Sequence, residues 1–180
     1  GSIKIVNNMM LQDVKGLEGL FILGGGLHIT DNHNLMNLEG VTNFGSMGGT
    51  LEIARNMALK SIDALININT IGGALILSEN ALIKDVEGLK HVQSIGETAS
   101  TGFIEITNNT ELSDLNGLMS ITAARGNLTI SNNEKLTSIY GLRHLNVVEG
   151  DLTVTYNPSL SWCEVEVIVE ALGTDGVEGN

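Results

Sequence analysis

The chain of 180 residues is poor in several residue types on which other classes of protein depend. It has one cysteine and one proline, 3% of its residues are aromatic, and 21 acidic residues outnumber 9 Lys and Arg. The single cysteine, Cys163, excludes an internal disulfide framework and a cysteine-based zinc site. The net charge of −12 argues against a nucleic-acid partner, because nucleic acids attract faces rich in Lys and Arg. The sequence has no run of about 18 apolar residues, so we expect no direct membrane insertion of this fragment.

The residues that are abundant indicate an aliphatic core with many tight turns. Hydrophobic residues make up 42% of the chain and glycine occurs 22 times. The core must therefore be filled by Leu, Ile and Val, and the turns must be made mostly by Gly and Asn. Gly1–Ser2 resembles an expression scar, so we expect the chain to be part of a longer protein. The remainder divides into repeats over residues 3–162 and a cap with a tail over residues 163–180.

An internal repeat covers most of the chain, and each repeat begins with a strand-like phrase of alternating apolar residues. The phrases begin at Ile3, Leu27, Leu51, Leu75, Ile104, Leu128 and Leu152. The steps between them are 24 residues, except for one of 29 whose additional residues fall around Glu97–Thr101. An asparagine follows every phrase at the same place, in the column Asn8, Asn32, Asn56, Asn80, Asn109, Asn133 and Asn157. Apolar residues then recur at every third position, and a glycine precedes one of them in nearly every repeat, with Ala64 the exception.

This pattern predicts an all-β solenoid, in which each thin layer buries its apolar edge only against its neighbours. Strands of successive layers would stack at roughly 4.8 Å. The recurring glycine beside an apolar position disfavours a regular helix, so we expect short strands and bends there. Cys163 occupies an apolar column and is expected to be a small buried hydrophobe.

The repeat stands as LTISNNEKLTSIYGLRHLNVVEG at 128–150 and as LHITDNHNLMNLEGVTNFGSMGG at 27–49. It resembles the receptor L domain, the leucine-rich-repeat-like domain of insulin- and EGF-receptor ectodomains, which also occurs in surface proteins of bacteria and protists. The resemblance covers about residues 3–160 and implies a right-handed β-helix of about seven 24-residue turns. It also implies an extracellular or cell-surface recognition module that is not an enzyme, uses no cofactor, and binds a protein or glycan on its outward strand face.

The segment CEVEVIVEALG at 163–173 changes period. Val165, Ile168, Val169 and Leu172 are spaced as one apolar stripe of a helix, and Gly173 is suited to end it. We therefore predict a short C-terminal helix that closes one end of the solenoid, followed by a tail.

Three columns of residues are expected to face outward, two within the strands and one just before the asparagine column. Their members vary in type, as expected of a tunable binding surface. The candidate ligand-binding residues are His28, Thr30, Glu52, Arg55, Ile76, Ser78, Glu105, Thr107, Thr129, Ser131, Thr153, Thr155 and Tyr156. The asparagine column itself is expected to turn inward, where its amides would pair with backbone groups and with one another.

Other interpretations of the same residues remain open. Asp31, Arg55 and Glu79 would lie on successive layers with alternating charge, as in a surface ion-pair ladder. A polysaccharide-cleaving β-helix would need a pair of carboxylates at a set separation, and Glu52 and Glu105 share a column but are separated by Ile76. The four histidines fall in different columns, so no metal site is predicted. Thr-rich rows on adjacent layers are a feature of proteins that bind ice or crystals. A structural stalk with no dedicated ligand is the alternative from another functional class.

Overall fold

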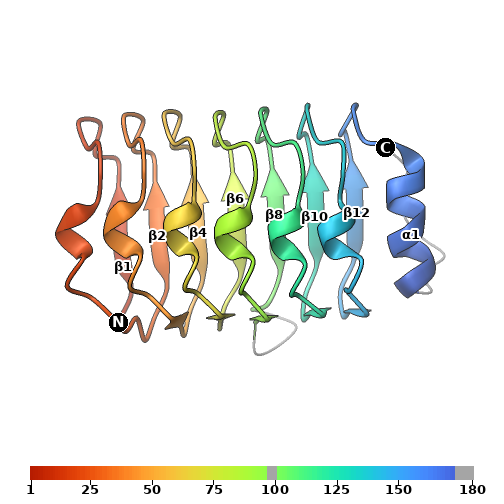
Figure 1. Cartoon of the computed structure of the whole chain (residues 1–180), viewed down its shortest axis with the longest axis horizontal. Coiled ribbons are helices and arrows are strands. Elements are labelled where there is room, and N and C mark those ends of the chain that lie inside the picture. Colours follow the sequence, from red (N-terminus) through yellow and green to blue (C-terminus); the bar gives the residue numbers. More distant parts are fainter. Residues whose placement is uncertain (97–100, 173–180) are drawn as a thin grey trace.

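Each repeat of the chain forms one flat layer, and the layers stack side by side along one axis with a helix at the C-terminal end (Figure 1). The computed structural model describes residues 1–96 and 101–172. Every layer opens with a four-residue strand. These strands are β1 (Ile3–Val6), β2 (Leu27–Thr30), β4 (Leu51–Ala54), β6 (Leu75–Ser78), β8 (Ile104–Thr107), β10 (Leu128–Ser131) and β12 (Leu152–Thr155). The predicted solenoid-like arrangement of stacked β-repeats is confirmed.

Within the described residues, the long strands pair in one seven-stranded parallel sheet of order β1-β2-β4-β6-β8-β10-β12. The register repeats, so that Leu27 lies opposite Leu51 and like residues of successive layers meet. The longer repeat does not disturb this register, because Leu75 pairs with Ile104. Its predicted insertion at 97–101 lies, apart from Thr101, outside the described residues.

The return path of each layer differs partly from the prediction of short strands and bends. Short strands are present as β3 (Ser46–Met47), β5 (Thr70–Ile71), β7 (Ser94–Ile95), β9 (Ala123–Ala124) and β11 (Val147–Val148). In the described ranges they form a second parallel sheet of order β11-β9-β7-β5-β3. Single turns of 3₁₀ helix replace the bends, namely η1 (Lys15–Leu17), η2 (Glu39–Val41), η3 (Asp63–Leu65), η4 (Glu87–Leu89), η5 (Asn116–Leu118) and η6 (Tyr140–Leu142).

A polar side chain two residues before each 3₁₀ turn explains why a helical turn forms there. Asp85 Oδ1 accepts the backbone N–H of Glu87 at 3.1 Å, and Ser61 Oγ accepts that of Asp63 at 2.9 Å. Such local bonds satisfy the free N–H groups at the start of a helical turn. The equivalent positions in the other layers are Asp13, Asn37, Asp114 and Ser138.

The glycine in the middle of these turns is explained by the preceding layer. A Cβ on Gly88 would overlap the backbone carbonyl oxygen of Ile62, which lies directly beneath it. Gly40, Gly117 and Gly141 are placed in the same way. Gly16 holds this position in the first layer, and a Cβ there would have no atom within 4 Å. The glycine column therefore permits close stacking of the layers rather than an unusual backbone angle.

The apolar columns fill a single interior between the two sheets. Leu27, Ile29 and Leu35 are fully buried, and their equivalents in the following layers are also buried, except Leu152 of the last layer, which is half-buried. Ile3 and Ile5 of the first layer are only half-buried, because one described layer covers them instead of two. The predicted aliphatic core is confirmed.

The C-terminal end of the core is closed by α1 (Trp162–Leu172), as the sequence predicts. Val165 and Ile168 are buried, and Val169 and Leu172 pack against the core. Gly173 and the tail lie outside the described residues.

A carboxylate on α1 takes over part of the role that a further layer would have. The backbone N–H of Leu115 donates to Ser138 O of the next layer at 3.2 Å. Ile139, one layer on, donates its N–H instead to Glu164 Oε2 at 3.1 Å, and Ser138 Oγ donates to the same oxygen at 2.9 Å. The helix therefore satisfies polar groups as well as covering apolar ones.

The prediction for Cys163 is wrong, because its side chain is exposed. The chain leaves the layered path at Trp162, and the first turn of α1 directs Cys163 away from the core.

Candidate functional site

The asparagine column is a continuous ladder of hydrogen bonds, buried from Asn32 to Asn157 and exposed at Asn8. Asn56 Oδ1 accepts the backbone N–H of Asn32 at 3.1 Å, and Asn56 Nδ2 donates to Ile29 O of the preceding layer at 2.8 Å. Nδ2 also donates to Ala54 O at 3.1 Å, which closes the bend at the end of the strand. The same pattern recurs with Asn80, Asn109 and Asn133. The ladder therefore has the structural role that the sequence predicts for it.

The residue before each ladder asparagine has a left-handed backbone conformation. The seven φ values lie between 54° and 61°, at Asn7, Asp31, Arg55, Glu79, Asn108, Asn132 and Tyr156. Asn and Asp tolerate this conformation better than other non-glycine residues. We call these seven residues the outward corner column, because the bend turns their side chains out where the strands end.

The N-terminal half of the outward surface is occupied by polar and charged side chains that pair with one another. Arg55 donates from Nε to Asp31 Oδ1 at 2.7 Å and from a terminal nitrogen to Oδ2 at 3.0 Å, and its other terminal nitrogen lies 3.9 Å from Glu79. His28 Nδ1 lies 2.8 Å from Glu52 Oε2. The hydrogen bond from Arg55 holds the pKa of the Asp31 carboxyl below its usual value, and Asp31 raises the pKa of Arg55. The predicted ion-pair ladder is therefore present.

Part of the predicted ligand-binding face is not accessible. Thr30, Ser78 and Thr107 point away from the core but are only 5%, 7% and 7% exposed. Ser131 and Thr155, at the same strand position, are half-buried. Of the five candidates at this strand position, Ser131 and Thr155 therefore offer more surface to a ligand than the other three, and ligand binding by any of them stays a prediction.

An apolar residue, Ile76, separates two carboxylates in the middle of the face. Ile76 stands between Glu52 and Glu105 in the sheet register, and all three are half-buried. Glu105 Oε1 accepts a hydrogen bond from Thr107 at 3.3 Å, whereas Glu52 is bound to His28. The structure therefore keeps the two carboxylates apart and gives each a different partner.

The C-terminal half of the face is uncharged. Thr129 lies opposite Thr153 and Ser131 opposite Thr155, so four hydroxyls form a compact patch on β10 and β12. This patch adjoins the outward corner column at Asn132 and Tyr156. We call the patch and these two corner residues the neutral half of the face.

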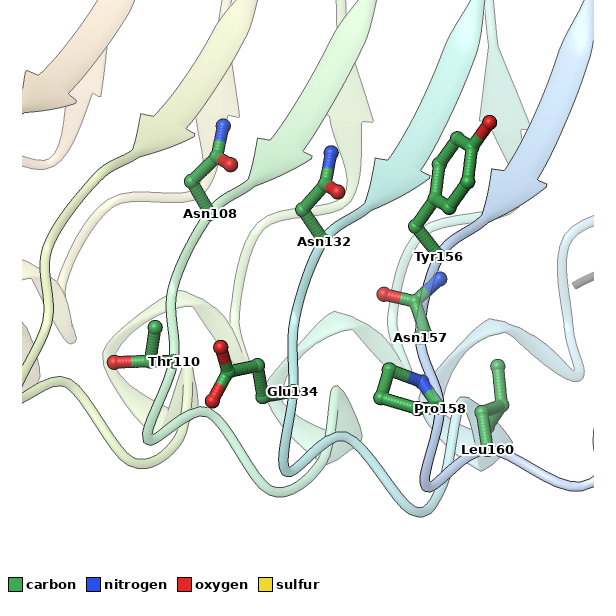
Figure 2. A pocket seen from close by; sticks show the side chains of 8 residues that line it. All are labelled: Asn108, Thr110, Asn132, Glu134, Tyr156, Asn157, Pro158 and Leu160. Atoms are coloured by element: carbon green, nitrogen blue, oxygen red, sulfur yellow. The ribbon is translucent and has the colours of Figure 1, made fainter.

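A groove runs along the ends of β8, β10 and β12 (Figure 2). Its volume is about 740 Å³, and it is lined by Asn108, Thr110, Asn132, Glu134, Tyr156, Asn157, Pro158 and Leu160. In Figure 2, Asn108, Asn132 and Tyr156 stand in a row at the strand ends, and Thr110, Glu134 and Pro158 lie below them. The Tyr156 side chain is prominent, with 74% of the residue exposed.

The sequence placed Tyr156 on the binding face but did not identify the groove. Asn108 and Asn132 belong to a column that was expected to face outward, whereas Thr110, Glu134 and Pro158 follow the asparagine ladder and gave no signal of their own. The useful signal was the frequency of Asn and Asp in the outward corner column, which indicates a repeated left-handed bend.

The described residues hold no cluster of three or more His, Cys, Asp or Glu side chains that could bind a metal ion. Over residues 1–96 and 101–172, no helix has both the length and the apolar character needed to span a bilayer. Comparison of the chain with protein-family models, with curated protein sequences and with solved structures gave no significant match.

Proposed function

We propose that the chain is a non-catalytic recognition module of the extracellular space or cell surface, which binds a protein or glycan on the outward face of the seven-stranded sheet. The proposal includes the finer fold of the receptor L domain, a right-handed β-helix of about seven turns. The resemblance of the repeat supports the fold and the location, and the neutral half of the face supports the binding role.

One observation supports recognition above the others: uncharged polar side chains, an exposed tyrosine and a groove lie together on a rigid support. The strand ends beneath them are fixed by the buried ladder through Asn109 and Asn133. A fixed surface loses little conformational entropy when a ligand binds. Exposed aromatic residues that also have a polar group are favoured at binding surfaces.

The groove is better suited to binding than to hydrolysis. Glycoside hydrolases commonly use two carboxyl groups on either side of the scissile bond. Among the described residues that line the groove, Glu134 is the one carboxylate. This observation favours a binding module over a carbohydrate-cleaving enzyme.

Printed arrays of neutral glycans and of secreted or cell-surface proteins test the proposal. We would compare the wild type with the double variant Thr129→Arg/Thr153→Arg, which places two long cations in the neutral half of the face. The control is Ser46→Arg, which changes an exposed residue of the second sheet. We expect a reproducible ligand that is lost in the double variant and kept in the control. If the chain is a structural stalk, the wild type binds nothing on either array, or the wild type, the double variant and the control all bind the same ligands equally.

A further inference from the structure

The outward corner column changes character along its length, although its backbone is the same in every layer. Asp31, Arg55 and Glu79 are joined by the ion pairs described above. Within the described part of the chain, the side chains of Asn108 and Tyr156 have no hydrogen-bond partner, whereas Asn132 makes a single bond of 3.4 Å to the neighbouring Ser131 hydroxyl. The polar groups at the C-terminal end of the column are therefore available to an external ligand.

Tyr156 is the member of the column whose conformation is hardest to explain from the chain alone. A left-handed backbone costs an L-residue about 1–2 kcal/mol, and a bulky residue is rarely found in it. Arg55 has the same conformation but binds Asp31 through two hydrogen bonds. The phenol of Tyr156 gains no comparable contact, so its role is better sought outside the chain.

The backbone N–H groups of two residues that line the groove, Asn108 and Asn132, already have partners in the next layer. The N–H of Asn108 donates to Ser131 O at 3.0 Å, and that of Asn132 donates to Thr155 O at 3.2 Å. An extended peptide commonly binds by adding a strand to a free sheet edge. β8 and β10 are interior strands and offer no such edge, and β12 ends the sheet with α1 lying beyond it (Figure 1). Recognition along β8 and β10 must therefore use side chains, so a ligand there must supply hydrogen-bonding groups of its own.

The charge of the chain and of the groove restricts the class of ligand further. The chain has a net charge of −12, and its groove is lined by one carboxylate and by no Lys or Arg among the described residues. Such a field repels sulfated, phosphorylated or carboxylated ligands. The amides of Asn108 and Asn132 and the carboxylate of Glu134 suit instead the hydroxyls of a neutral sugar. The Tyr156 ring offers a flat surface for the apolar face of the sugar.

We infer that the groove at the ends of β8, β10 and β12 is a binding site for a neutral glycan. A pyranose ring lies against Tyr156, and its hydroxyls bond to Asn108, Asn132 and Glu134. This inference rests on the proposed recognition function and specifies its ligand class and position. It extends the proposed binding surface from the strand face to the groove at the strand ends.

The experiment uses four neutral hexasaccharides as probes, built from glucose, mannose, xylose or N-acetylglucosamine, with binding measured by isothermal titration calorimetry. Tyr156→Asn removes the ring and introduces a residue that the column already uses in the same conformation, so the variant is expected to fold. Tyr156→Phe keeps the ring. The matched control Glu79→Asn makes the same kind of change at the same backbone position, outside the groove.

We expect at least one hexasaccharide to bind, with an affinity about tenfold weaker in Tyr156→Asn, since an aromatic contact contributes about 1–1.5 kcal/mol. Glu79→Asn should change the affinity by less than about twofold, and Tyr156→Phe, which keeps the ring, should bind more tightly than Tyr156→Asn. The inference is overturned if no hexasaccharide binds at millimolar concentration, or if binding is unchanged in Tyr156→Asn. The inference is also overturned if a protein from the array, and not a glycan, binds in the groove.

The two proposals fail in different ways. If Thr129→Arg/Thr153→Arg loses the ligand but Tyr156→Asn still binds it, the recognition function is supported and the glycan site in the groove is refuted. An absence of any ligand on both arrays removes the two together.

Discussion

Replacing one interior member of the asparagine ladder should destabilise the protein far more than replacing the first member. In Asn56→Ala, the chain loses two short hydrogen bonds from Nδ2 to Ile29 O and Ala54 O, and a longer one of 3.4 Å to Asn80 Oδ1. It also leaves the buried N–H of Asn32 without an acceptor in the described structure, because Asn56 Oδ1 is its partner. Each lost bond contributes about 1 kcal/mol, and an unsatisfied buried donor costs about 1–3 kcal/mol. The expected loss of unfolding free energy is therefore about 3–5 kcal/mol.

Asn8→Ala is the matched control, since it makes the same substitution in the same column. Asn8 is exposed, and its Nδ2 donates to Val6 O at 3.1 Å and to Asn32 Oδ1 at 3.2 Å. No described residue donates to its own Oδ1, so the substitution leaves no buried N–H unsatisfied. We expect a loss of about 1 kcal/mol or less.

Urea unfolding measures both variants. Circular dichroism reports on the whole stack, and fluorescence of Trp162, the single tryptophan, reports on the cap. The two signals should be recorded together, because stacked repeats can unfold in parts. Equal losses in Asn56→Ala and Asn8→Ala would refute the assignment of the ladder as a buried structural network.

Three further predictions concern the glycine column, the outward corner column and acid stability. Gly88→Ala should lower the unfolding free energy by about 3 kcal/mol or more, because the added Cβ would overlap the backbone of the preceding layer. Gly16→Ala should leave the unfolding free energy unchanged or raise it by about 0.5–1 kcal/mol. Chemical denaturation compares the two variants, and equal effects would contradict the stacking explanation. Glu79→Asn should raise the unfolding free energy by up to about 1 kcal/mol by relieving the left-handed strain, and a clear loss in the same assay would contradict this. The lowered pKa of Asp31 stabilises the fold above the carboxyl's unfolded pKa, and this contribution disappears as pH falls through the folded pKa. NMR titration should therefore show the pKa of Asp31 rising in Arg55→Gln, and an unchanged value would refute the hydrogen bond as its cause.

The features that recur in every repeat could be predicted from the sequence. The strand register, the inward columns and the buried ladder follow from a fixed period, because one layer can stack only against an equivalent layer. The stripe of Val165 and Ile168 predicted the closing helix because its period differs from that of the repeat. Cys163 was misassigned because it stands where the repeat ends, so its column no longer defines its environment.

The features that depend on neighbouring side chains could not be predicted. Thr30 and Ser78 alternate correctly with the core residues, but their burial is set by the length of the side chains around them. The 3₁₀ turns had a sequence signal in the polar residue that precedes each of them, such as Asp85, but that residue type also occurs in ordinary bends. The groove depends on the join between the strand ends and the loop that contains Glu134, which no single column describes.

The division between fixed and variable columns explains how one backbone can hold two different surfaces. The ladder and the glycine column fix the position of every strand end, so a substitution in the outward corner column changes the surface and leaves the layer in place. In the N-terminal half this freedom is used for Arg55 and its acidic neighbours, which satisfy one another and offer few free groups. In the C-terminal half Asn132 and Tyr156 stand on the same rigid support without such partners. The support holds them in position before a ligand arrives, so the proposed binding at this end would carry only a small entropic cost.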